Sequence, residues 1–72
     1  MYLTDDPLFR GAPEHLKTYL GDGAYCVFDG NAYWLMAERD GLVHKVALEP
    51  PGVAALVKFR AGVKAAHPGV WA

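Results

Sequence analysis

The sequence lacks serine altogether and holds a single cysteine, Cys26. Without serine, no mechanism that depends on a serine nucleophile is open to this chain. One cysteine excludes an internal disulfide and a zinc site made of several thiolates, and it fits a reducing compartment. His15, His44 and His67 are spread over separate predicted elements, so their spacing predicts no metal site. We therefore expect neither a metal nor a cofactor.

Motifs of catalysis and of nucleotide binding are missing as well. Glu38, Asp40 and Glu49 are spread over a hairpin and a strand end, without the close pairing that acid–base catalysis requires. His44 has no acidic or nucleophilic partner that the sequence places beside it. The glycines occur at turns, with neither a Walker nor a dinucleotide-binding pattern around them. The sequence therefore predicts a protein that is not an enzyme.

The chain also lacks long apolar runs and a strong net charge. No segment approaches the roughly 20 apolar residues that cross a bilayer, and residues 1–9 lack the basic start and apolar core of a signal peptide. The net charge of −1 favours neither a protein that wraps DNA nor an acidic mimic of DNA. We therefore expect a cytoplasmic protein without membrane contact. The length predicts one domain, 1–72, which consists of an N-terminal arm over 1–11, a folded core over 12–66 and a tail over 67–72.

Tight-turn sequences between apolar runs predict three consecutive antiparallel strands from Ala24 to Leu48. Asp40-Gly41 is the signal of a two-residue hairpin. Upstream, the two-residue loop is either Asp29-Gly30 or Gly30-Asn31; both give the same faces, whereas a three-residue loop would turn the first strand over. The predicted register pairs Arg39 with Leu42, Ala37 with His44, Leu35 with Val46 and Tyr33 with Leu48.

Helix signals flank the strands. Thr4–Asp6 followed by Pro7 predicts a short helical start, and the apolar residues of the arm are expected to pin it to the body. Residues 12–20 carry apolar residues at helical spacing between a proline and a glycine, which predicts a helix. Residues 50–66 predict a second helix with an apolar stripe. The stripe consists of Val53, Leu56, Phe59 and Val63, with Ala66 at its edge.

The fold class that follows is α+β, in the order α-β-β-β-α, with a three-stranded antiparallel meander packed on the C-terminal helix. Both sheet faces are apolar, and we expect that helix to cover the face with Val46. The opposite face holds Tyr25, Trp34 and Met36, residue types enriched at interface centres, and is the first candidate partner-binding site. Two alternatives remain open: the N-terminal segment covers this face, or two copies pair through it. The protein is then a monomer or a homodimer.

The last helix supplies a second candidate site. Residues 50–72 carry Lys58, Arg60 and Lys64 and no acid. Lys58 is expected to point away from the apolar stripe, while Arg60 and Lys64 flank it. These bases suit an acidic surface on a protein partner. The alternative is a solvated helix flank whose cations complement the negative helix end.

The order helix, three strands, helix resembles the double-stranded RNA-binding domain and the messenger-RNA interferase toxins of the HicA type. The first family opens its last helix with a basic cluster, where this chain reads Pro50-Pro51-Gly52-Val53. The second uses a histidine on its middle strand, whereas residues 32–39 hold none and His44 lies on the next strand. An RNA-binding module is therefore the alternative function, and nucleic acid is not the expected partner.

Short segments in the middle and last parts of the chain form a further pattern: Phe28-Asp29-Gly30, Trp34-Leu35, Ala37-Glu38, Val46-Ala47-Leu48-Glu49-Pro50, Ala55-Leu56 and Phe59. In this pattern the chain resembles small orphan proteins of phages, prophages and plasmids, a group that includes many anti-CRISPR proteins. The resemblance implies a non-enzymatic inhibitor in the cytoplasm of the bacterial host. Such an inhibitor sterically blocks a Cas protein or a surveillance complex, so the implied partner is a Cas effector subunit. The group shares no common motif, so no functional residue is carried over.

Overall fold

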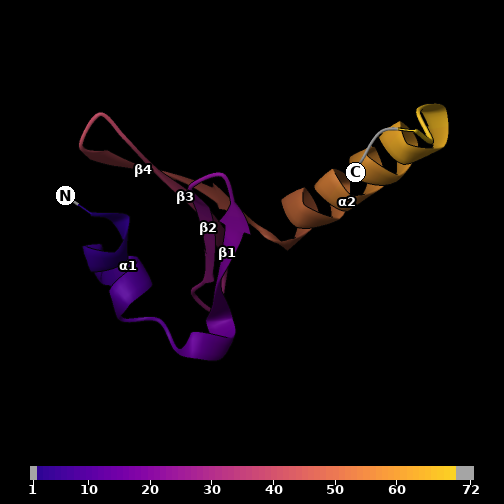
Figure 1. Ribbon diagram of the computed structural model, residues 1–72. Helices are drawn as coiled ribbons and strands as arrows, with labels where there is room; N and C mark the ends of the chain where they lie inside the picture. Colours follow the sequence, from indigo (N-terminus) through magenta and orange to yellow (C-terminus); the bar gives the residue numbers. More distant parts are fainter. Residues whose placement is uncertain (1, 70–72) are drawn as a thin grey trace.

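The computed structural model describes residues 2–69, which form one antiparallel sheet with short helices before it and a long helix after it (Figure 1). The order of the strands in the sheet, β1-β2-β3-β4, follows the sequence. The α+β class, the antiparallel meander and the C-terminal helix are confirmed, with four strands in place of three. The elements are the 3-10 helix η1 (Leu3–Asp5), α1 (Pro7–Arg10), the 3-10 helix η2 (Glu14–Leu16), β1 (Lys17–Gly21), β2 (Ala24–Phe28), β3 (Tyr33–Arg39), β4 (Leu42–Leu48) and α2 (Pro50–Ala66).

The hairpin between β3 and β4 forms as predicted. Asp40 and Gly41 adopt φ values of 55° and 74°, the left-handed pair that a two-residue hairpin turn of the I′ type requires. The four predicted pairs between the two strands are all present, Leu35 opposite Val46 among them. Turn chemistry therefore fixes which side chains of β3 and β4 share a face.

The hairpin between β2 and β3 follows one of the two predicted loops. Phe28 pairs with Tyr33, which is the register that a Gly30-Asn31 loop gives. The Asp29 N–H donates to the Ala32 carbonyl oxygen at 3.1 Å across the base of this loop. The predicted faces of β2 are thus correct, with Cys26 and Phe28 on the same side as Tyr33.

The helix predicted over residues 12–20 does not form. Its first half is the short η2, and its second half is β1, which pairs with β2 through Lys17 opposite Val27 and Tyr19 opposite Tyr25. So short a helix is marginal in water. The strand instead pairs its backbone donors and acceptors with those along the edge of β2. The helix prediction was wrong because the spacing of apolar residues does not show that the edge of β2 is available for pairing.

The sheet has two faces, and the N-terminal segment lies against only one of them (Figure 1). We call the covered one the near face. Its core consists of Val27 and Met36, which are 1% and 2% exposed, together with Leu3 from η1. Of the arm predicted over residues 1–11, the described part is thus pinned to the body through Leu3, Leu8 and Phe9, as expected. The partly buried residues packed against this core are Leu8, Phe9, Ala12, Tyr25, Trp34 and Val43.

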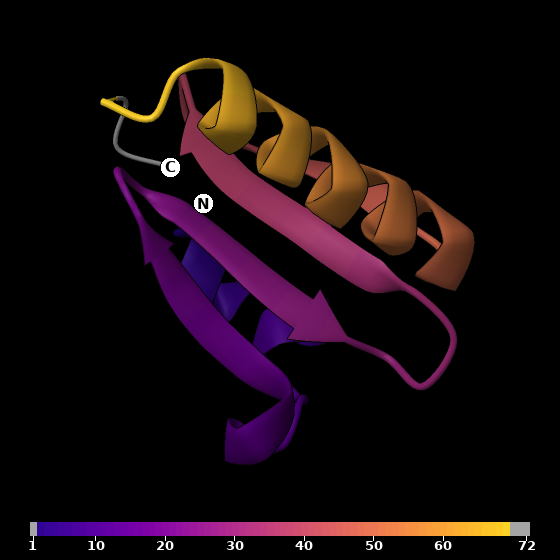
Figure 2. The same cartoon turned by 90° about the vertical axis from the view of Figure 1, so that its right-hand side faces the viewer.

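The opposite, far face is not covered by α2 as the sequence predicted. Figure 1 views the sheet nearly edge-on and shows α2 leaving the end of β4 and pointing away from the sheet. In Figure 2, which looks at the far face, β1 and β2 lie open and the N-terminal helices lie behind the sheet. No side chain of α2 is buried in the described part of the chain. Apolar side chains that share the far face are Cys26, Phe28, Tyr33, Leu35, Leu42, Val46 and Leu48.

A rigid connector explains why α2 points away from the sheet. Only Glu49 separates β4 from α2, and it has φ −72° and ψ 163°. A residue before proline is restricted to this extended region, and Pro50 follows directly. The helix then begins at once, because the N–H groups of Gly52 and Val53 donate to the Glu49 carbonyl oxygen at 2.8 and 3.1 Å. The chain thus has no slack with which to turn the helix back.

The molecule is extended for its length. Its radius of gyration is 13.9 Å, whereas a compact chain of this size has roughly 11 Å. None of the helices in the part of the chain that the structure describes is long and apolar enough to cross a membrane. The last three residues of the predicted tail, including Trp71, lie outside the described residues.

Candidate functional site

The first predicted partner-binding site is covered. Met36 is buried in the near-face core, and Tyr25 and Trp34 are half-buried beside it. The Tyr25 ring meets the Phe9 ring edge to face, with centroids 5.1 Å apart and planes at 78°. Phe9 comes from α1, so the N-terminal segment covers this face, which is one of the two alternatives that the sequence left open. These three residues therefore stabilise the fold and do not form an open apolar patch.

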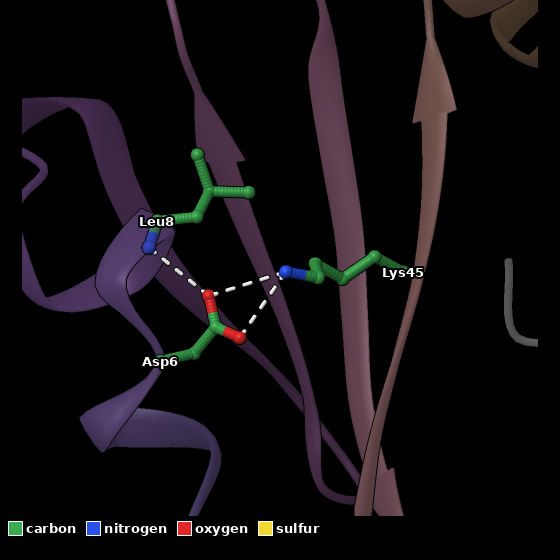
Figure 3. Close-up of polar contacts among 3 residues, drawn as sticks. All are labelled: Asp6, Leu8 and Lys45. Atoms are coloured by element: carbon green, nitrogen blue, oxygen red, sulfur yellow. Dashed lines mark hydrogen bonds and ion pairs between the residues drawn. The ribbon is translucent and has the colours of Figure 1, made fainter.

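A carboxylate joins the N-terminal segment to β4 of the sheet (Figure 3). Asp6 is 5% exposed and caps α1 by accepting the Leu8 N–H at 3.0 Å. The same carboxylate forms an ion pair with Lys45 Nζ of β4 at 3.2 Å. The cap and the ion pair give the buried oxygens of this side chain hydrogen-bonding partners, which offsets the cost of burying them. One side chain thus starts the helix and fixes it to the near face.

Two further contacts hold the segment along its length. The Leu3 N–H donates to Glu38 Oε1 of β3 at 2.7 Å. Farther on, Lys17 Nζ donates to the Phe9 carbonyl oxygen at 3.0 Å and lies 4.8 Å from the centroid of the Phe9 ring. The near face is therefore closed by packing and by polar contacts together.

The far face is the apolar surface that remains open. Val46 is 58% exposed and Leu42 63%, and Tyr33 is also exposed. Phe28 and Tyr33 stack on this face with ring centroids 4.7 Å apart. A depression of about 270 Å³ lies beside these rings, lined by residues of η2, β1, β2 and β3 that include Cys26. Sequence reasoning had assigned this face to the core beneath α2.

The second predicted site lies on the open helix. Lys58, Arg60 and Lys64 are all exposed on α2, and Lys64 lies in its last turn. The apolar stripe beside them is open too, since Phe59 is 68% exposed and Leu56 50%. The structure thus brings the predicted bases together with unburied apolar side chains on one helix.

A polar contact at the loop between β2 and β3 orients Trp34. The indole N–H of Trp34 donates to Asp29 Oδ2 at 2.8 Å. The N–H groups of Asn31 and Ala32 both donate to Asp29 Oδ1 at 2.8 Å. The Trp34 hydrogen bond, followed by those from Ala32 and Asn31, lowers the pKa of the Asp29 carboxyl below its ordinary value of 3.8. Asp29 thus acts as a turn residue and as the acceptor for the indole.

We expect this loop to loosen in acid. A carboxyl with a lowered folded pKa contributes stability that is complete above its unfolded pKa and is lost as the pH falls through the folded one. The loss therefore begins near pH 3.8 and is completed below it. The Trp34 indole resonance, followed by NMR from pH 6 down to about 2, is expected to shift through this window. Asp29→Asn is the control, and an equal shift in that variant would contradict the assignment.

Cys26 and the possible metal ligands are the remaining reactive groups of residues 2–69 that the structure describes. Burial raises the pKa of the half-buried Cys26 thiol, which disfavours the nucleophilic thiolate. Among residues 2–69, no three His, Cys, Asp or Glu side chains are grouped so that they could hold a metal ion. The open surfaces of residues 2–69 therefore offer a partner exposed apolar side chains and, on α2, basic charge.

Comparison of this chain with protein-family models, with curated proteins and with solved structures finds no match.

Proposed function

We propose that this chain is a small non-enzymatic protein-binding module that contacts its partner through α2. The observation that carries the proposal is the open helix: Leu56, Val57 and Phe59 are exposed by half or more on an element that carries only basic charges. Large exposed apolar side chains gathered on one helix are typical of an interaction site. A helix laid against a partner is a common mode of protein recognition.

The partner is a protein with an acidic surface. Between Pro50 and Ala66 the charged residues are Lys58, Arg60 and Lys64, and this range contains no Asp or Glu. Electrostatic complementarity of this kind steers association and selects the partner. Together with the resemblance to phage and plasmid proteins, this charge supports an inhibitor of the anti-CRISPR type. Such an inhibitor acts in the cytoplasm of a bacterial host and blocks a Cas effector subunit sterically.

The test is inhibition of purified Cas effector complexes in a DNA cleavage assay. We expect the wild-type chain to stop cleavage at near-stoichiometric amounts. Reversing two charges with Lys58→Glu and Lys64→Glu is expected to weaken inhibition by about tenfold or more, because like charges across an interface repel. The matched control is Arg10→Glu with Arg39→Glu, which changes net charge equally at exposed positions away from α2.

The outcomes separate the parts of this proposal. No inhibition of any effector by the wild-type chain would overturn the anti-CRISPR function. Equal losses in the α2 variant and in the control would remove the basic side of α2 from the interface. Full inhibition by both would leave the apolar residues as the only contact.

RNA binding is the second candidate, favoured by the same acid-free run of bases on an open helix. A complex with RNA would weaken steeply with salt. The logarithm of its binding constant falls with the logarithm of the salt concentration, with a slope of about −0.7 for each phosphate neutralised on a single strand. An apolar protein interface lacks this dependence. Fluorescence anisotropy of a labelled RNA at two salt concentrations distinguishes the two.

A further inference from the structure

Among residues 2–69, two apolar surfaces stay exposed, and they are complementary in kind. The far face is an apolar sheet surface on which Tyr33, Leu42 and Val46 are exposed, and the stripe of α2 is an apolar helix surface on which Leu56 and Phe59 are exposed. Their lengths agree. A helix of 17 residues spans about 25 Å, and strands of seven residues span about 23 Å.

We infer that two copies of this chain pair by exchanging α2, so that the stripe of each α2 packs on the far face of the other chain. Both surfaces occur once on every chain, so a two-fold pair satisfies all four at the same time. A foreign partner would have to supply a sheet and a helix together to do the same. A second copy is therefore the occupant that the composition of the two surfaces favours.

The exposed area supports a second copy. The chain exposes 5528 Å², whereas a compact monomer of 7.8 kDa exposes roughly 4,400 Å². The excess of roughly 1,100 Å² exceeds the roughly 800 Å² that each partner buries in a typical stable complex. The area left open is thus enough for a stable dimer.

The connector decides between exchange and closure on the same chain. Glu49 alone joins β4 to α2, and Pro50 and Pro51 fix the first helical positions. The first turn of α2 also lies close to the end of β4, because a β-carbon placed on Gly52 would lie 3.6 Å from Leu48 Cδ2. Short, rigid connectors favour exchange of an element between copies, because the element cannot reach its own body without strain.

The pairing goes beyond the proposed function: it takes up Leu56 and Phe59 of the stripe, and it leaves Val57 and the basic side of α2 to the partner. Lys58 lies on the side of α2 away from Phe59 and Val63, because its position on the helix is about 100° or more from theirs. In the dimer it stays exposed and can meet an acidic partner. The single variant Lys58→Glu is therefore expected to remain a dimer while it weakens inhibition, so each proposal can fail alone.

Sedimentation velocity over a range of protein concentrations tests the dimer. We expect the wild-type chain to reach twice 7.8 kDa. Phe59→Glu is expected to raise the dimer dissociation constant by about thirtyfold or more, as for a central interface residue. Val57→Glu is the matched control: it is 60% exposed and lies two positions earlier, about 200° around the helix. A wild-type chain that stays at 7.8 kDa, or two variants that behave alike, would overturn the inference.

Two further measurements test the exchange itself. A chain lengthened by four glycine and serine residues after Glu49 is expected to become a folded monomer, because its own far face is then within reach at an effective concentration of about millimolar. If this chain dimerises as tightly as the wild type, the two copies pair without exchange.

Mixing provides the second measurement. Phe59→Glu and Val46→Lys are each expected to yield monomers, whereas an equal mixture is expected to yield mixed dimers. In the mixture, one of the two helix-on-sheet contacts carries native residues on both sides. Circular dichroism checks that both variants fold, since both positions are exposed in the single chain. If the mixture stays monomeric, the exchange is wrong.

Discussion

Replacing Met36 with alanine is expected to remove about 2–5 kcal/mol from the free energy of unfolding. Met36 is 2% exposed and lies in the core cluster with Leu3 and Val27, so truncation leaves a cavity. A domain of 72 residues has a total of about 4–11 kcal/mol. The Met36→Ala variant is therefore expected to lose a large share of its stability, measured as a lower melting temperature and a lower urea midpoint.

Val57→Ala is the matched control for this prediction. Val57 is exposed on α2, so its truncation removes little buried area, and the expected change is within about 0.5 kcal/mol. Both chains are compared at one protein concentration, because pairing of copies would make stability concentration-dependent. If Met36→Ala costs no more than Val57→Ala, the near face cannot be the core.

The register between β3 and β4, and the two faces of β2, were predictable from turn chemistry. The Asp40-Gly41 and Gly30-Asn31 turns admit few backbone geometries, and each geometry fixes which residues lie opposite one another. Because side chains alternate along a strand, the faces follow at once. This is why Leu35 and Val46 were correctly placed on one face.

Which face is covered was not predictable by the same reasoning. Both faces are apolar, and the cover depends on contacts between residues far apart in the chain, such as Leu3 with the Met36 cluster. The sequence showed a capped helix start at Pro7 with apolar residues around it, but it did not show which face of the sheet these residues pack on. The partner-binding role expected of Tyr25, Trp34 and Met36 required this face to stay open, and the structure shows the alternative in which the N-terminal segment covers it.

The direction of α2 has a local cause that the sequence does carry. Pro50 and Pro51 marked the helix start correctly, but their effect on Glu49 also restricts how the helix leaves β4. An apolar stripe shows that a helix needs a partner, without showing whether that partner is its own sheet. The bases at Lys58 and Lys64 were placed correctly because an exposed helix position depends on little beyond the helix itself.

The second large effect is expected at Asp6. Asp6→Ala removes both the cap of α1 and the ion pair to Lys45. Loss of a helix cap costs about 1 kcal/mol, and loss of the ion pair adds about 1–2 kcal/mol, since Lys45 is partly exposed and solvent weakens the pair. We expect urea denaturation to show a total loss of about 2–3 kcal/mol.

A double-mutant cycle separates the two roles of this carboxylate. Asp6→Asn keeps an oxygen that can accept the Leu8 N–H but removes the charge, whereas Lys45→Met keeps an apolar stem and removes the cation. If the ion pair stabilises the fold, the double variant loses less than the sum of the single losses, by about 1 kcal/mol or more. Additive losses would mean that Asp6 acts as a helix cap alone. The N-terminal segment would then be held on the near face by its apolar residues, and raising the salt concentration would leave its stability unchanged.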